Sequence, residues 1–231
     1  TRGCFGQCPF CVNKNKTVSV PASPVYEFYN PQKKKICLLD DNFLACGEWS
    51  ALLGQLRETG RPVQFRQGLD IRLITRQKSR ELASCRLDGD LLFAFDNIKD
   101  KETVIEKMKI INPIFQESKR IKFYVLTGFD ADGRYDWTFW KQDILQAFER
   151  IRILMGVRAY PYIMRYEKYQ ESPYRGMYVN LSRWCNQPQM YKQMSFREFC
   201  HLSKEGSACR TYLEEYERDF PEISSYFDMK F

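Results

Sequence analysis

Two hydrophobic patterns alternate through the middle of the chain. Five short runs are almost entirely apolar, as expected for strands buried on both faces, and they cover 36–40, 63–66, 91–96, 121–126 and 159–164. Between these runs, apolar residues recur at every third or fourth position, which is typical of helices that bury one face. This second pattern is clear over 49–56, 104–115 and 137–151 and weaker over 76–84.

Strict alternation of strands and helices favours a parallel sheet built from crossover units. The chain is too short for a complete eight-stranded barrel. We therefore predict an α/β fold, a partial and open (β/α)6-type barrel over 1–166. A mainly helical, aromatic-rich extension over 167–231 is expected to pack on the barrel. Asp100 is the expected N-cap of the 104–115 helix, and Ser195 with Glu198 has the spacing of a capping box ahead of another helix.

Composition narrows the class of protein. No apolar run approaches the roughly 18 to 20 residues of a membrane-spanning helix, so a membrane protein is excluded. The nine cysteines are an odd number, no signal peptide precedes them, and most of the last six lie singly in apolar patterns. We therefore expect reduced thiols and a cytoplasmic location. The net charge of +7 permits contact with nucleic acid but does not require it.

Three cysteines crowd into one short segment near the start of the chain. The run Cys4-Phe5-Gly6-Gln7-Cys8-Pro9-Phe10-Cys11 has the spacing C-x3-C-x2-C. Three thiolates on one loop can bind three irons of a cubane cluster and leave the fourth iron open. The alternative is a structural zinc site completed by Cys37 or Cys46, although such sites usually have two close pairs of ligands.

This motif, followed by the barrel pattern, resembles the radical S-adenosylmethionine (SAM) superfamily. The Thr-Arg-Gly lead-in to Cys4 and the run 39–43 are similar to the branch that includes cobalamin-dependent enzymes and methylthiotransferases. The segments 65–73, 93–96, 124–126 and 183–184 resemble a group of bacterial and phage radical SAM proteins of unassigned substrate. The resemblance covers the chain from residue 1 to about 199.

The resemblance implies an enzyme with a [4Fe–4S] cluster bound by Cys4, Cys8 and Cys11. The open iron would chelate SAM, and one electron would cleave SAM to methionine and a 5'-deoxyadenosyl radical that abstracts hydrogen from a substrate. A flavodoxin or ferredoxin would supply the electron. The substrate is unknown, with an anionic molecule or nucleic acid mildly favoured by charge, and no residue is assigned as catalytic.

The resemblance also implies where SAM would bind. Phe10 would pack near the adenine, and Asp41 and Asn42 occupy the place where the family binds the SAM amino group, with Asp40 an alternative. The remaining contacts fall after later strands: Arg66 or Arg72 for the SAM carboxylate, Gln67, Asp70 and Asp96 for the ribose hydroxyls or substrate, and the backbone of Val125 to Gly128 and of Ile163 and Met164 beside the adenine.

Plainer interpretations of the same residues stay open. Residues 40–42 could form an N-cap and turn before the helix at Trp49, and Asp70 with Arg72 could be a buried ion pair or a helix start. Asp96 could have no ligand role and simply begin the loop that leads to the next helix. The whole chain could instead be a non-catalytic zinc- or nucleic-acid-binding module, or a barrel that binds SAM without turnover.

The family's first barrel strand precedes its cysteine loop, and here three residues precede Cys4. We therefore expect the strand at 36–40 to have an exposed edge. Cobalamin would be a cofactor only if a domain upstream of this sequence bound it.

Overall fold

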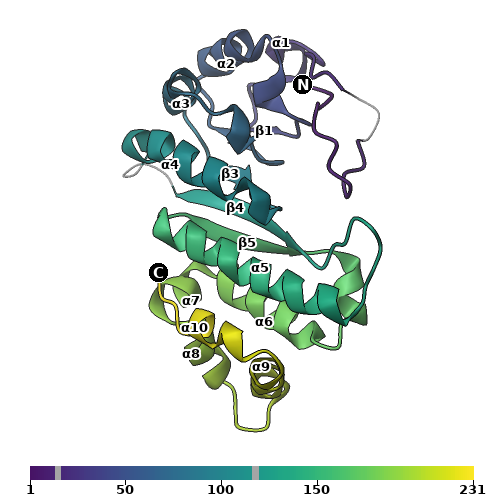
Figure 1. Cartoon of the computed structure of the whole chain (residues 1–231). Helices are drawn as coiled ribbons and strands as arrows, with labels where there is room; N and C mark the ends of the chain where they lie inside the picture. Colours follow the sequence, from purple (N-terminus) through teal and green to yellow (C-terminus); the bar gives the residue numbers. More distant parts are fainter. Residues whose placement is uncertain (14–16, 116–119) are drawn as a thin grey trace. The chain divides into compact units, whose positions relative to one another are not determined.

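The computed structural model describes residues 1–13, 17–115 and 120–231, which form a mixed α/β fold (Figure 1). The chain divides into two compact units. Unit 1 comprises Thr1–Ala94 and Glu102–Lys122, and unit 2 comprises Phe95–Lys101 and Phe123–Phe231. The predicted boundary at 166 between a barrel and an extension is a different division and stays a prediction.

Unit 1 contains three short strands, with helices between them. Its elements are α1 (Val25–Phe28), β1 (Ile36–Leu38), the 3-10 turn η1 (Phe43–Ala45), α2 (Trp49–Glu58), β2 (Val63–Phe65), the 3-10 turn η2 (Ile71–Leu73), α3 (Arg76–Ala83), β3 (Leu91–Ala94) and most of α4 (Lys101–Phe115). Strands β1 and β2 are parallel, with Ile36 opposite Val63. A further parallel bridge pairs Leu69 with Phe93.

Helix α2 shows why the predicted periodicity holds. Its Leu52, Leu53 and Leu56 are buried, and the helix packs against α1 and α3. Burying these side chains stabilises the unit by about 1.5 to 3 kcal/mol for each leucine. Helix α3 begins at the N-cap Thr75, whose side chain accepts a hydrogen bond from the N–H of Lys78.

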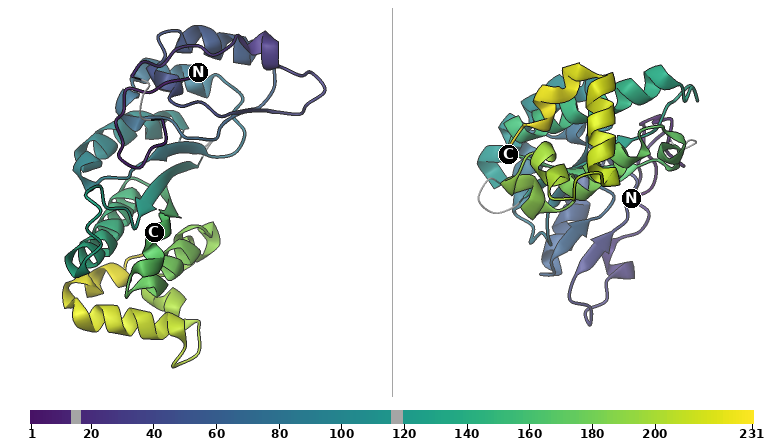
Figure 2. Two further views of the ribbon diagram at one scale, coloured as in Figure 1. Left: turned by 90° about the vertical axis from the view of Figure 1, so that its right-hand side faces the viewer. Right: turned by 90° about the horizontal axis from the view of Figure 1, so that it is seen from below.

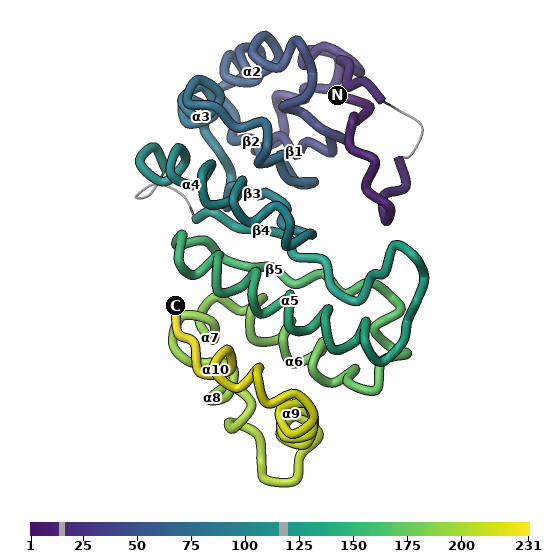
Figure 3. Tube along the Cα trace, viewed as in Figure 1, coloured from purple at the N-terminus to yellow at the C-terminus, as the bar shows by residue number. Residues whose placement is uncertain are grey.

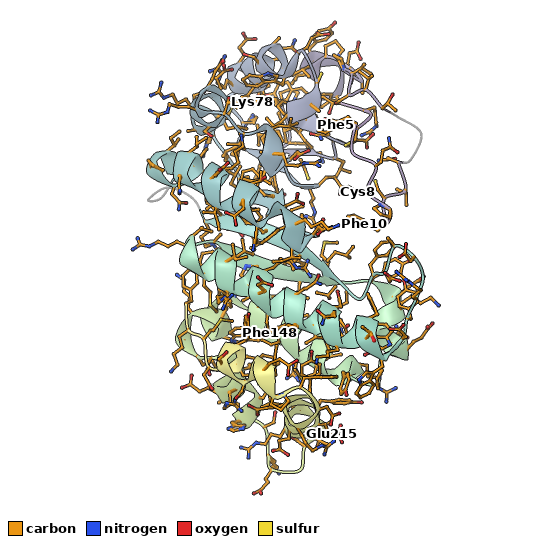
Figure 4. The ribbon with its side chains drawn as sticks, viewed as in Figure 1. Phe5, Cys8, Phe10, Lys78, Phe148 and Glu215 are labelled. Carbon is orange, nitrogen blue, oxygen red and sulfur yellow. The ribbon has the colours of Figure 1, made fainter. Side chains whose placement is uncertain are left out.

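Unit 2 holds most of β4 (Ile121–Thr127) and the long helix α5 (Trp137–Gly156). The other elements are the 3-10 turn η3 (Ile98–Asp100), β5 (Tyr160–Arg165), η4 (Glu167–Glu171), α6 (Arg175–Cys185), α7 (Pro188–Gln193), α8 (Phe196–His201), α9 (Ala208–Asp219), η5 (Pro221–Ile223) and α10 (Ser224–Phe227). Both α5 and α6 pack against β5, and α6 packs against α9 (Figure 2). Phe148 on α5 contacts the rings of Phe196 and Phe227, both 5.1 Å away between centroids (Figure 4).

The strands of the described residues form two sheets, one of order β1-β2 and one of order β3-β4-β5. The N–H of Leu91 donates to the carbonyl of Arg120, and that of Phe95 donates to the carbonyl of Tyr124. These bonds advance in the same direction along β3 and β4, which makes the two strands parallel. Parallel strands with helical connections are therefore confirmed, whereas the (β/α)6-type barrel stays a prediction.

The five predicted strands are present within two residues of their predicted ends. The capping box is confirmed: the N–H of Ser195 donates to Glu198 at 2.8 Å, and the N–H of Glu198 donates to Ser195 Oγ at 3.2 Å. The prediction of Asp100 as an N-cap is wrong. Asp100 ends η3, which continues directly into α4, and Asn97 caps η3 by accepting a bond from the N–H of Lys99.

Strand β1 pairs with β2 alone among the described strands, so its other edge carries no strand of this part of the chain. None of the described helices combines the length and the apolar character needed to cross a membrane.

Candidate functional site

The segment with the three cysteines is a loop closed at its base. Arg2 and Val20 form an antiparallel bridge in which each N–H donates to the other's carbonyl at 2.9 Å. Gly3 lies next to this bridge with φ of +95°, and a Cβ there would lie 1.9 Å from the carbonyl oxygen of Val18. Only glycine combines this conformation with such a close approach of backbone. Figure 3 shows the loop leaving the N-terminus near β1.

The residues after β1 hold both arms of this cysteine loop. Asp41 accepts a hydrogen bond from the N–H of Gly3 at 2.7 Å through Oδ2 and one from Asn13 Nδ2 at 2.9 Å through Oδ1. The carbonyl of Asn42 accepts a bond from Ser19 Oγ at 2.8 Å. Asp41 therefore shapes the loop with both carboxylate oxygens, and SAM binding by Asp41 stays a prediction.

The loop directs N–H groups at two of its sulfurs. The N–H of Gly6 donates to Cys4 Sγ at 3.3 Å, and the N–H of Asn13 donates to Cys11 Sγ at 3.4 Å. Asn42 Nδ2 also donates to Cys4 Sγ, at 3.4 Å. Hydrogen bonds of this kind stabilise thiolates and help to set the potential of iron–sulfur clusters.

The donor set is suited to a cluster. A Cβ on Gly6 would lie 3.3 Å from Cys4 Sγ and 3.7 Å from Cys8 Sγ, so a side chain at this position would crowd the sulfur of Cys4 and touch that of Cys8. Cys8 and Phe10 belong to the same loop (Figure 4), and Cys11 completes a turn by donating its N–H to the carbonyl of Cys8 at 3.0 Å.

Within the described ranges, no three or more His, Cys, Asp or Glu side chains converge as they would on one metal ion. Neither Cys37 nor Cys46 therefore completes a zinc site with the loop in this structure. Cysteines that bind separate irons of a cluster lie farther apart than the ligands of one zinc ion. Whether Cys4, Cys8 and Cys11 bind a cluster stays a prediction.

Next to Cys4, a buried polar network begins at Asn42. This residue is 5% exposed, and its Nδ2 donates to Asp70 Oδ2 at 3.2 Å as well as to Cys4. Its Oδ1 is buried and accepts no hydrogen bond within the described part of the chain. A buried carbonyl of this kind is a ready acceptor for an N–H donor of a ligand. Asn42 precedes η1, but its side chain does not cap that turn.

Asp70 and Arg72 form an ion pair, but it is not the buried pair that one alternative expected, because the Arg72 side chain is 44% exposed and only that of Asp70, 10% exposed, is mostly covered. Arg72 Nε and Nη2 donate to the two carboxylate oxygens of Asp70 at 2.8 and 2.7 Å, and the N–H of Arg72 donates to Oδ1 at 3.1 Å. Asp70 also caps the turn η2. The guanidinium of Arg72 lies 5.3 Å from the ring centre of Phe5. Arg66 and Gln67, directly after β2, are exposed.

The other predicted contacts lie in unit 2. Asp96 Oδ1 accepts a hydrogen bond from the N–H of Leu126 at 2.9 Å, and burial raises the pKa of the Asp96 carboxyl. Val125 is buried in β4, and the N–H of Gly128 donates to Asp143 Oδ2 at 2.7 Å. Met164 is 44% exposed, and its carbonyl accepts a bond from Thr127 Oγ1 at 3.3 Å.

Sequence reasoning missed the buried Arg150 and the half-buried Asp143 on α5. Arg150 is 2% exposed, and its Nη1 donates to the carbonyls of Phe95, Asp96 and Leu126 at 3.1, 2.9 and 3.0 Å. Burial lowers the pKa of Arg150 and raises that of Asp143, while the attraction between the two charges opposes both shifts. Asp143 and Arg150 are seven residues apart, beside the apolar Ile144 and Ile151. That spacing on one helix face was the available signal.

Comparisons of the chain with models of known protein families, with curated proteins and with solved structures gave no match.

Proposed function

We propose that the protein is a radical SAM enzyme in which Cys4, Cys8 and Cys11 bind a [4Fe–4S] cluster. The observation that carries the proposal is a C-x3-C-x2-C loop fastened to the end of a parallel strand, with N–H groups directed at the sulfurs of Cys4 and Cys11. When bound, the cluster supplies the electron that cleaves SAM to methionine and a 5'-deoxyadenosyl radical. The proposed setting is a partial (β/α)6-type barrel in the cytoplasm, with an external reductant.

The residues around the loop would prepare the site in distinct ways. Asp41 holds Gly3 and Asn13, which fixes the two arms that carry the cysteines. The buried Oδ1 of Asn42 would accept a hydrogen bond from the amino group of SAM. This assignment satisfies an oxygen that is otherwise buried without a partner in the described structure.

Two arginines are candidates for the SAM carboxylate. The guanidinium of Arg72 already makes a two-point contact with Asp70, so a carboxylate bound there would compete with Asp70 or use the remaining nitrogen. Arg66 is exposed after β2. Substitution of each arginine by methionine, followed by SAM binding measurements, distinguishes the two.

The test is reductive cleavage of SAM by anaerobically reconstituted protein. We expect 5'-deoxyadenosine and methionine in equal amounts, only with reductant, and we expect Cys4→Ala, Cys8→Ala and Cys11→Ala to abolish both. Cys37→Ala is the matched control, because Cys37 is an exposed cysteine of β1 outside the loop. Wild-type protein that contains iron and sulfide but never cleaves SAM would contradict the enzyme and favour a SAM-binding barrel without turnover.

A further inference from the structure

The side-chain amide of Asn42 joins the sulfur of Cys4 to the Asp70–Arg72 ion pair through two hydrogen bonds. Its orientation is fixed by its neighbours, because Cys4 Sγ and Asp70 Oδ2 both act as acceptors toward it. Only the amide nitrogen can donate to both, so Nδ2 must face them and Oδ1 must face away. Both hydrogens of the amide are thereby used.

The rest of the network keeps this amide in place. Asp70 receives three hydrogen bonds from Arg72 in addition to the one from Asn42. The Asp70 side chain is 10% exposed, so its position is defined by these contacts and not by water. A carboxylate held in this way leaves the Asn42 amide one orientation, in which its second hydrogen is directed at Cys4.

The hydrogen bond from Asn42 to Cys4 would affect the reduction potential of a bound cluster. A reduced iron–sulfur cluster carries one more negative charge than the oxidised cluster, and an N–H directed at a ligand sulfur stabilises the more negative state. Asn42 is 95% buried, since its exposed fraction is 5%, so water does not readily replace its hydrogen bond. Removal of this donor therefore favours the oxidised cluster.

We propose that Asn42 is a positioning residue that raises the reduction potential of the cluster through its hydrogen bond to Cys4. This inference rests on the proposed function, because it needs a cluster on Cys4, Cys8 and Cys11. It assigns Asn42 a role in electron acceptance that is separate from any contact of its Oδ1 with SAM.

The test is an anaerobic redox titration of the reconstituted protein without SAM, in which electron paramagnetic resonance measures the fraction of reduced cluster. Asn42→Leu removes the donor at similar volume, and Asn42→Asp replaces the donor with a carboxylate of the same shape. We expect the midpoint potential to fall in both variants and to fall further in Asn42→Asp, because its negative charge opposes reduction. At the wild-type midpoint, the reduced fraction should drop several-fold.

Asn180→Leu is the matched control. Asn180 is 4% exposed in unit 2, and its Nδ2 donates to a backbone carbonyl, that of Cys209. The potential of this variant should equal that of the wild type. An unchanged potential in Asn42→Leu with full iron content overturns the inference. If Asn42→Leu retains no iron, an unchanged potential in Asn42→Asp overturns the inference. Absence of iron from the wild type instead overturns the proposed function.

Discussion

The carboxylate of Asp41 accepts a hydrogen bond from the backbone N–H of Gly3 at 2.7 Å, across 38 residues of sequence. Its other oxygen accepts a bond from Asn13, on the far side of the three cysteines. One side chain after β1 thus holds both ends of the segment in which the cysteines lie. The spacing of the cysteines is local, but the shape of their loop depends on a residue supplied by the sheet.

Asp41→Ala should therefore destabilise the protein by about 2 kcal/mol, because two hydrogen bonds to a charged, mostly buried carboxylate are lost. Asp41→Asn should cost less, since the amide oxygen can still accept from Gly3. Urea unfolding measures both. Asp88→Asn, which alters an exposed ion pair with Lys35, is the control and should change stability by less than about 1 kcal/mol. Equal effects at Asp41 and Asp88 would show that the loop does not depend on Asp41.

Gly3→Ala should disrupt the base of the loop. The new Cβ would clash with the carbonyl oxygen of Val18, and φ of +95° disfavours any other residue. Gly60→Ala is a matched control, because Gly60 also has positive φ, +64°, but has open space at its Cβ position. The control should cost about 1 kcal/mol in unfolding free energy, and Gly3→Ala should cost clearly more and lose iron on reconstitution. The prediction fails if the two alanine variants unfold alike.

Arg150→Met should destabilise unit 2 by about 3 to 5 kcal/mol, because three carbonyls lose their shared donor and the half-buried carboxylates of Asp96 and Asp143 lose the positive charge near them. Arg150→Lys should recover part of this loss by restoring the charge. Arg152→Met is the control on the same helix, where Arg152 is exposed and lies 4.7 Å from the ring centre of Tyr226. Denaturant unfolding monitored by tryptophan fluorescence compares the three variants. Arg150→Met as stable as Arg152→Met would contradict a structural role for the buried charge.

Glu217 should contribute stability only above a defined pH. Hydrogen bonds from Arg197 at 2.6 and 2.7 Å, followed by one from Ser224, lower the pKa of Glu217 below its ordinary 4.5. Because the folded pKa is depressed, the contribution is full above pH 4.5 and is lost as pH falls below that value toward the folded pKa. We expect Glu217→Gln to cost on the order of 1 kcal/mol at pH 7 and progressively less below pH 4.5.

Glu214→Gln, at an exposed position of the same helix α9, is the control. Thermal unfolding between pH 3.5 and pH 7 should show no such pH-dependent difference for that variant. A difference between Glu217→Gln and wild type that persists unchanged at the acidic end would show that the Arg197 contact does not set the pKa.

Most helices and strands of this fold can be predicted from the sequence, because local patterns of apolar and capping residues determine them. The apolar runs fall on the strands, and the capping box at Ser195 and Glu198 marks the start of α8. Asp100 illustrates the limit of that reasoning. A 3-10 turn capped by Asn97 continues into α4, and the choice of cap depends on the backbone of the preceding loop.

The site is less predictable, because its contacts join residues far apart in the sequence. The motif identifies Cys4, Cys8 and Cys11, but Asp41 and Asn42 reach the loop only through the return of the chain after β1. The role of Arg150 was not predicted from the sequence for a similar reason. A single arginine on a helix is usually exposed, and only the paired strands β3 and β4 bring three carbonyls to it.

The most direct measurement of the central claim is iron and acid-labile sulfide per chain in protein purified without oxygen. The account predicts about four of each, bound by Cys4, Cys8 and Cys11. Cys8→Ala should lose both, whereas Cys37→Ala, outside the loop, should retain both. One zinc per chain with no iron, or iron retained in full by Cys8→Ala, would contradict the account.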